Sequence, residues 1–305
     1  MNGVLVIDKP QGPTSHDLVA VARRALGERS IGHTGTLDPL ATGVLPLACG
    51  KATRLVRFLS ASDKAYDAVV RFGVATDSYD LAGRVVQESP VRPTRQSIED
   101  AIASLVGLHL QTPPAFSAKR VGGQRAYDLA RQDKPVAVVP VPVTLHSAEI
   151  IATTGDEATV RLVCSAGFYV RSFAHDLGQL VGSCACLAAL RRTRAGRFTL
   201  EGAVDATVLA EAGTPEGAER IRSAVVPMSA LLPELGAVLV DQVGLARVLH
   251  GQDLEPRHVH PLGQDVPLPL EQAPWTRVLG PTGDLVAMAT PGAGPGALHP
   301  AVVLI

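Results

Sequence analysis

The sequence predicts an α+β fold, in which a mixed, largely antiparallel β-sheet is followed by a small β-rich domain at the C-terminal end. Segments rich in β-forming residues are interspersed with amphipathic helical segments. Two predicted strands, 144–151 and 159–163, are joined by a short polar turn, which favours an antiparallel hairpin over a crossover helix. After Leu200 the chain becomes rich in Ala with Gly and Pro interruptions, which indicates a boundary.

The N-terminal segment predicts a strand followed by a helix. Residues 4–7 form a short apolar run that ends in a turn rich in Pro and Gly, as expected of a buried strand. Thr14 or Ser15 can cap the helix that follows, and Gly27 stands where a left-handed residue would end it. The glycine-punctuated stretch 32–50 shows little helical or strand periodicity, so we predict a loop there.

The middle of the chain mixes strands and helices. Residues 65–73 are rich in β-formers and predict a strand. Helices are predicted over 94–106 and 169–181, because apolar residues recur on one helical face in each. We assign residues 1–235 to one domain, which includes a linker from about residue 201, and residues 236–305 to a small C-terminal domain of short apolar runs.

Composition places the chain among ordinary globular proteins. Of its 305 residues, 46% are hydrophobic and 19% are charged, which excludes a disordered or fibrous chain. No apolar stretch reaches the about 18 residues of a membrane span, and the N-terminus lacks a secretory signal, so we expect a cytoplasmic protein. Irregular cysteine spacing predicts reduced thiols. Cys184 and Cys186 are expected to be small buried thiols in the turn after a helix, with no metal site.

Charge is balanced overall but clustered locally. The formal net charge is −1, so the molecule as a whole lacks the strong positive charge typical of nucleic-acid-binding proteins. The segment 190–197 nevertheless holds four arginines and no acid, and Lys119, Arg120, Arg125 and Arg131 form a second cluster. Such clusters are usually solvated faces, but together they would also suit a polyanion bound on one side.

The densest candidate for chemistry is the glycine-rich segment 32–45 around Asp38. An aspartate before a proline commonly starts a turn or caps a backbone amide, and it can also be held rigidly in a partly dry cleft. The nearby Gly50 and Lys51 do not complete a phosphate-binding P-loop, because Ala52 stands where that motif needs Ser or Thr. Motifs of serine hydrolases, zincins and dinucleotide-binding enzymes are absent from the sequence.

The string Gly-Thr-Leu-Asp-Pro-Leu-Ala-Thr-Gly-Val at 35–44 resembles the catalytic motif of the TruB family of pseudouridine synthases. Four other segments are similar to family motifs and occur in family order: 3–10, 64–66, 167–171 and 190–192. The resemblance spans about residues 1–200. It implies a sheet of the pseudouridine synthase type and a PUA-like RNA-binding domain over 236–305, although the C-terminal part matches that domain poorly and Phe168 replaces the more usual threonine.

The resemblance implies that Asp38 is the catalytic carboxylate. Pseudouridine formation breaks the N1 glycosidic bond of uridine, rotates the uracil and joins its C5 to the same ribose carbon. Because there is no net redox change, no cofactor is needed. Three roles for Asp38 stay open, namely nucleophile at C1′, nucleophile at C6, and base that removes a ribose proton to leave a glycal.

Other site residues are assigned by the same resemblance. Arg171 would pair with Asp38, and Tyr66 would stack on the target base and complete the catalytic set. His33 would occupy the space left by the extruded base. The remaining residues expected to bind substrate are Leu190, which would wall the base pocket, Tyr169, and the candidate phosphate contacts Lys9, Lys51, Arg191, Arg192 and Arg194. Lys9 has an alternative role as a support of the active-site loop.

The function that the resemblance implies is isomerisation of the T-loop uridine at tRNA position 55 to pseudouridine. The expected partner is the T-arm of tRNA, with no membrane and no obligate protein partner, and we expect a monomer. Two alternatives are an RNA-binding tRNA chaperone without essential catalysis and a pseudouridine synthase that acts on another RNA. The intact set of Asp38, Tyr66 and Arg171 argues against lost catalysis.

Overall fold

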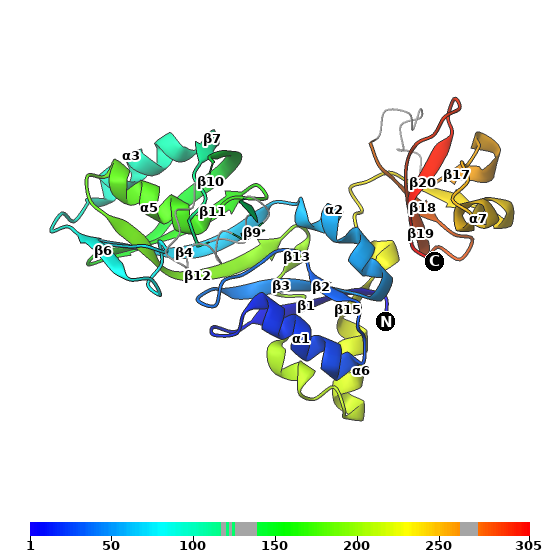
Figure 1. Cartoon of the computed structure of the whole chain (residues 1–305), viewed down its shortest axis with the longest axis horizontal. Coiled ribbons are helices and arrows are strands. Elements are labelled where there is room, and N and C mark those ends of the chain that lie inside the picture. Colours follow the sequence, from blue (N-terminus) through cyan, green and yellow to red (C-terminus); the bar gives the residue numbers. More distant parts are fainter. Residues whose placement is uncertain (117–119, 122–123, 126–138, 263–273) are drawn as a thin grey trace.

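The computed structural model describes residues 1–116, 120–121, 124–125, 139–262 and 274–305. Its main body is an 11-stranded sheet in which eight strands follow the order β14-β1-β3-β12-β4-β11-β10-β7, while β13, β15 and β2 pair beside them (Figure 1). The strands are β1 (Gly3–Lys9), β2 (Ile31–His33), β3 (Thr42–Cys49), β4 (Lys64–Phe72), β7 (Gly107–Gln111), β10 (Val141–Thr154), β11 (Glu157–Cys164), β12 (Ala185–Ala195), β13 (Phe198–Thr199), β14 (Val204–Asp205) and β15 (Val225–Pro227).

Antiparallel pairing dominates this sheet. Among the ladders of this sheet in the described residues, only the β1–β14 and β3–β12 pairs are parallel. The hairpin predicted from residues 144–163 is present as β10 and β11, which are longer than expected and joined by a tight turn. The predicted fold class, α+β on a mixed and largely antiparallel sheet, is therefore confirmed.

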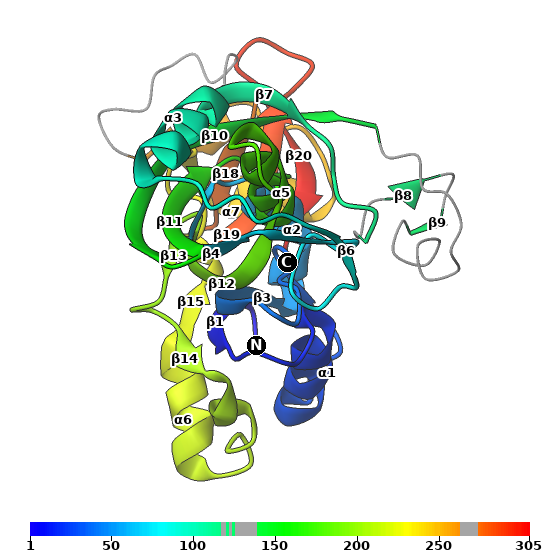
Figure 2. The same ribbon diagram turned by 90° about the vertical axis from the view of Figure 1, so that its left-hand side faces the viewer.

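Three helices form where the sequence predicted them, and a fourth lies in the stretch predicted to be a linker. Helix α1 (Ser15–Leu26) starts with a capping box between Thr14 and Asp17 and ends at Gly27, whose φ of 60° is left-handed. Helix α3 (Arg95–Leu105) packs on β10, and α5 (Val170–Leu180) packs on β12. Helix α6 (Pro215–Ala224) contacts β1. In Figures 1 and 2, α3 and α5 occupy the upper part of the main body, whereas α1 and α6 lie below β1.

Among the strands that were not predicted, β3 and β12 are long. The stretch 32–50 was expected to be a loop, but its second half is the buried strand β3, whose apolar run shows no alternation because both faces are covered. Strand β12 passes through the arginine-rich segment, so the neighbouring Arg191 and Arg192 lie on opposite sides of a strand. Cys186 lies in this strand and not in a turn after a helix, which corrects that expectation. All four cysteines are buried free thiols.

A second, five-stranded sheet has the order β17-β16-β18-β19-β20, and all its strands come from residues 237–303. Residues of this sheet share a hydrophobic cluster with β1 and β3, and the guanidinium of Arg57 lies 4.5 Å from the ring centroid of Trp275. The elements here are β16 (Ala237–Val240), α7 (Gln242–Leu249), η4 (Pro256–His258), β17 (Val259–Pro261), β18 (Thr276–Leu279), β19 (Leu285–Pro291) and β20 (Leu298–Val303).

Short elements connect the larger ones. They are η1 (Gly50–Leu55), α2 (Val56–Ser60), β5 (Val74–Thr76), β6 (Val85–Glu88), β8 (Arg120–Val121), β9 (Gln124–Arg125), η2 (Ala206–Leu209) and η3 (Met228–Ala230). The β5–β6 pair closes a turn over residues 77–84 that returns to the edge of β12 through a bridge between Asp80 and Leu187. Among the residues described, no helix is both long enough and apolar enough to cross a membrane.

Candidate active site

Asp38 and Arg171 meet although they come from different parts of the fold. Asp38 lies in the loop between β2 and β3, and Arg171 lies in the first turn of α5. Oδ2 of Asp38 is 2.9 Å from Nε of Arg171. The arginine side chain is 8% exposed, whereas that of the aspartate is 41% exposed. One side of the carboxylate is thus held by a buried cation, and the other side is open to a substrate.

The loop that carries Asp38 is held by buried side chains from three elements. The hydroxyl of Ser15 accepts a hydrogen bond from the N–H of Leu37 at 2.8 Å and donates one to its carbonyl at 2.9 Å. Nζ of Lys9 donates to the carbonyl of Ala41 at 2.7 Å. The guanidinium of Arg192 donates to the carbonyls of Gly35, Thr36 and Val44. The carboxylate therefore sits on a rigid support.

These contacts correct two of the predicted phosphate contacts. Arg192 is 1% exposed and its guanidinium is occupied by the carbonyls of the catalytic loop, so it cannot reach a phosphate. Lys9 is 0% exposed, and its ammonium bonds the carbonyls of Pro10 and Ala41. The alternative interpretation of Lys9, as a support of the active-site loop, agrees with this geometry.

Arg171 also contacts a second carboxylate. Its Nη1 is 3.7 Å from Oδ2 of Asp80 and donates to the carbonyl of Ser78 at 3.0 Å, while Nη2 donates to the carbonyl of Phe116 at 2.8 Å. Sequence reasoning missed Asp80, because it lies in a short turn that resembles any solvent-exposed β-turn. No local pattern could have revealed it, since the contact depends on how α5 packs against that turn.

Burial and the neighbouring charges act on the pKa of Asp38 in opposite directions. Burial raises the pKa of Asp38, the charge of Arg171 lowers it, and the negative charge of Asp80 raises it. Burial also lowers the pKa of Lys9 to about 8, although the nearby Asp38 carboxylate favours the charged ammonium. The ion pair with Arg171 is the main interaction that keeps Asp38 charged.

Tyr66 and Leu190 come from adjacent strands. Tyr66 lies on β4 opposite Arg192 of β12, and it is 8% exposed. Burial raises the pKa of Tyr66. The positive charge of Arg192 and a hydrogen bond with its side chain lower that pKa. Leu190 is half-buried and packs against the main hydrophobic core. The same buried arginine thus links the loop of Asp38 to Tyr66.

Tyr169 is held through its backbone. Its N–H donates to Oε1 of Gln111 at 2.8 Å, and its carbonyl accepts from Nε2 of Gln111 at 3.1 Å. Gln111 is 1% exposed and ends β7. Next to it, the hydroxyl of Ser172 donates to the carbonyl of Thr112 at 2.7 Å. Sequence reasoning did not single out Gln111, which ties the residue before α5 to the edge strand of the sheet.

The remaining predicted residues differ in accessibility. Arg191 is 42% exposed and pairs with Asp8 at 2.7 Å, Arg194 is half-buried, and Lys51 is exposed. His33 is half-buried at the end of β2; burial and the charge of Arg192 lower its pKa, and its Nδ1 has no hydrogen-bond partner among the residues described. The second basic cluster, from Lys119 onward, has its side chains outside the described part of the chain.

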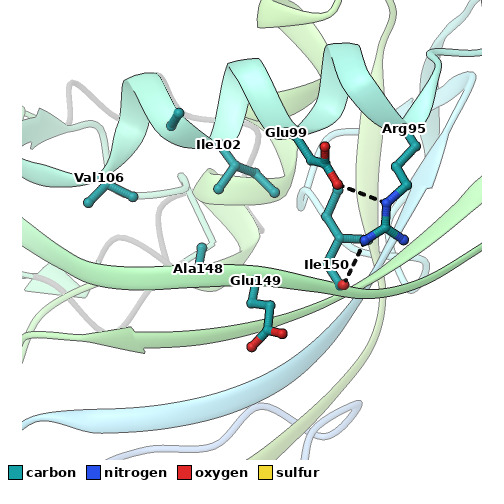
Figure 3. Close-up of a pocket in the computed structure, with 8 residues that line it drawn as sticks. Arg95, Glu99, Ile102, Val106, Ala148, Glu149 and Ile150 are labelled. Atoms are coloured by element: carbon teal, nitrogen blue, oxygen red, sulfur yellow. Dashed lines mark hydrogen bonds and ion pairs between the residues drawn. The ribbon is translucent and has the colours of Figure 1, made fainter.

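A separate groove lies between α3 and β10 and has a volume of about 520 Å³ (Figure 3). Arg95 spans one end of it, bonding Glu99 at 2.8 Å and the carbonyl of Ile150 at 3.3 Å. The residues that line it are Arg95, Glu99, Ile102, Ala103, Val106, Ala148, Glu149 and Ile150. None of them is a predicted site residue, so this groove does not bear on the candidate chemistry.

The chain is similar in sequence to known proteins. Residues 23–170 match the model of the TruB family pseudouridylate synthase N-terminal domain, and residues 171–233 match that of the tRNA pseudouridylate synthase B C-terminal domain. The chain is 41% identical to tRNA pseudouridine synthase B of Solibacter usitatus, with 100% of both chains covered. It is 42% identical to the protein of the same name from Aromatoleum aromaticum, with 83% of this chain and 81% of that protein covered.

A solved structure is similar over the whole chain. The archaeal box H/ACA sRNP Nop10–Cbf5 complex contains a chain that superimposes with a TM-score of 0.75 at 25% identity, which covers 100% of this chain and 86% of that chain. The similarity extends over both sheets.

Proposed function

Because this chain belongs to the TruB family of tRNA pseudouridine synthases, we propose that it isomerises the T-loop uridine at tRNA position 55 to pseudouridine. The enzyme is an isomerase. The relatives named tRNA pseudouridine synthase B favour this activity over RNA binding without catalysis. The position within tRNA is the specific part of the proposal.

The observation that carries the proposed mechanism is the 2.9 Å contact between Asp38 and Arg171 at a half-open site. The reaction needs a carboxylate that acts as a nucleophile at C1′ or C6 of the uridine, or as the base that removes a ribose proton. Each route requires the charged form of Asp38. Arg171 favours that form and leaves the second face of the carboxylate free for the substrate.

The isomerisation balances without any outside reagent. The bond between N1 and C1′ breaks, the uracil turns, and C5 forms a new bond to C1′. N1 ends with a proton, and the proton of C5 is released. The enzyme therefore has to hold the detached uracil in place, which we assign to Tyr66 and Leu190 on the adjacent strands β4 and β12, with Tyr169 completing the binding site.

Access to the base requires extrusion of the uridine from the folded RNA, at a cost of a few kcal/mol. We assign His33 to the space that the base leaves. Because burial lowers the pKa of His33, a neutral imidazole is expected there. The accessible cations Lys51, Arg191 and Arg194 are the proposed phosphate contacts, and they would position the T-arm without reading its sequence.

The five-stranded sheet after residue 236 would act as a PUA-like RNA-binding domain. We propose that the protein works as a monomer without an obligate protein partner, and that tRNA is its macromolecular partner. Its tRNA substrate and its buried, free cysteines fit a cytoplasmic setting.

The experiment uses an unmodified tRNA transcript that carries tritium at C5 of its uridines. Formation of pseudouridine releases this tritium to water, and sequence mapping of the product identifies the position. We expect release of about one equivalent from position 55 and none from a transcript with cytidine at that position. Release that persists from the cytidine transcript would contradict the assigned position.

Asp38→Asn separates catalysis from binding. The variant keeps the size of the side chain but cannot carry the charge, so tritium release should fall below detection while tRNA binding stays within a few-fold of the parent protein. A variant that released tritium at the parent rate would exclude the role given to Asp38.

A further inference from the structure

Tyr79 has an unusual backbone conformation beside the candidate active site. Its φ is 64°, and within the described ranges Leu232 is the other non-glycine residue with positive φ. Residues other than Gly, Asn and Asp are disfavoured in this left-handed conformation, because their Cβ crowds the following carbonyl. Tyr79 stands between Ser78 and Asp80, the two residues of this turn that contact Arg171. Strain at this place points to a role for the ring.

The ring of Tyr79 is stacked on that of His175. Their centroids are 4.1 Å apart and their planes differ by 12°. His175 lies one turn after Arg171 on α5, so both side chains project from the same face of the helix. Helix α5 thereby contacts three successive residues of the turn: Arg171 contacts the residues on either side, and His175 contacts Tyr79 between them.

The contact of the His175 imidazole with the turn is made by the face of its ring. Its Nδ1 is buried and has no hydrogen-bond partner in the described part of the chain. A histidine placed here for hydrogen bonding would be expected to satisfy that atom. The structure stacks the imidazole on the phenol ring, which indicates that ring stacking is the reason for its position.

The turn itself aims the carboxylate of Asp80. Oδ1 accepts from the hydroxyl of Ser78 at 2.7 Å and from the N–H of Ala82 at 3.0 Å, so Oδ2 is left to face Arg171. The carbonyl of Tyr79 accepts from the N–H of Leu187 on β12 at 2.9 Å. Because these hydrogen bonds fix the conformation of the turn, a contact that holds Tyr79 also positions Ser78 and Asp80.

We propose that Tyr79 and His175 form an aromatic clasp that positions Ser78 and Asp80 against Arg171, and through Arg171 orients Asp38. The inference rests on the proposed function. Both residues of the clasp are positioning residues, because they act through Arg171. The loss expected on opening the clasp is a slower chemical step with tRNA binding retained, since the proposed RNA-binding residues lie on other elements.

Four variants test the stacking. Tyr79→Phe and His175→Phe keep two stacked rings, whereas Tyr79→Gly keeps the backbone conformation without a ring and His175→Ala removes the partner. Under single-turnover conditions we expect Tyr79→Gly and His175→Ala to lose about 10- to 100-fold in the rate of tritium release, because small displacements of catalytic groups are costly. The tRNA dissociation constant should change less than twofold, and both Phe variants should keep at least half of the rate.

The double variant and a matched control complete the test. If the rings act as one unit, Tyr79→Gly combined with His175→Ala loses no more than either single change. Thr214→Ala removes the hydroxyl that caps α6 and serves as the control for a general loss of stability. It should leave the single-turnover rate unchanged. Additive losses in the double variant, or equal losses in the Phe variants, would overturn the clasp.

Amide hydrogen exchange tests the clasp independently of the isomerisation reaction. In the protein without RNA, Tyr79→Gly and His175→Ala should speed amide exchange in residues 77–84 relative to both Phe variants. Unchanged exchange in all four variants overturns the clasp. If the parent protein releases no tritium from tRNA, the proposed function fails, and the exchange data still decide whether the rings hold the turn.

Discussion

Ser15 and Leu37 exchange two hydrogen bonds through a single hydroxyl, which joins the first residue of α1 to the residue that precedes Asp38. Both peptide groups of Leu37 are satisfied in this way, and Ser15 is 2% exposed. The start of the helix therefore sets the position of the catalytic loop.

Ser15→Ala should lower both stability and activity. It leaves a buried N–H and a buried carbonyl without partners, at a cost of about 1–3 kcal/mol each in free energy of unfolding, less whatever water or local movement recovers. We expect a lower Tm and at least a tenfold slower single-turnover rate. The control is Ser223→Ala, which removes a hydroxyl bonded to Arg220 on the exposed helix α6. A parent-like rate in Ser15→Ala would show that the loop holds its position without this contact.

The rate of tritium release should depend on the ionisation of Asp38. The rate is expected to rise with pH as Asp38 loses its proton, and the pKa of Asp38 is above its ordinary value because of burial. Single-turnover rates measured at a series of acidic pH values give this rising limb of the pH–rate profile. Because the charge of Asp80 raises the pKa of Asp38, Asp80→Asn should move the limb to lower pH.

Arg171→Gln should have the opposite effect on the same limb. The guanidinium lowers the pKa of Asp38, so its removal raises that pKa and moves the limb to higher pH. The plateau rate should also fall, because the carboxylate is no longer oriented. Limbs that coincide in the parent protein and both variants would indicate that another group controls the acid dependence.

Gln111→Met tests the link between β7 and Tyr169. The thioether keeps the length of the side chain but cannot pair with the peptide groups of Tyr169, so two buried backbone groups lose their partners. A loss of about 2–4 kcal/mol in the free energy of unfolding is expected, measured by denaturant titration. Gln96→Met on the exposed face of α3 is the matched control. Equal stability of the two variants would contradict the assigned contact.

The arginines of β12 should separate into two groups. Arg191→Gln and Arg194→Gln are expected to weaken tRNA binding and to reduce the slope of log affinity against log salt by about 0.7–0.9 per contact, with little change in Tm. Arg192→Gln should instead lower Tm strongly, because it removes charged hydrogen bonds from three carbonyls, of which that of Val44 is buried. The tRNA affinity of each variant is measured over a series of salt concentrations. An unchanged slope of log affinity against log salt in Arg191→Gln and Arg194→Gln would contradict their assignment as phosphate contacts.

The sequence alone determined the features that depend on neighbouring residues. The capping box of Thr14 and Asp17, the left-handed Gly27 and the hairpin of β10 and β11 are encoded in short windows, where the responsible side chains lie within a few residues of the backbone they act on. The motif around Asp38 and the segment 167–171 likewise indicated the family and the partner Arg171.

Tertiary structure decided what sheet pairing brings together. The burial of Arg192 beside the accessible Arg191 follows from the alternation of side chains along β12, a strand that local periodicity did not reveal. Asp80 reaches Arg171, and Tyr79 reaches His175, only because α5 packs against the turn between β5 and β6. No short window of sequence contains both members of such a pair, so the physical reason for each contact exists only once the chain is folded.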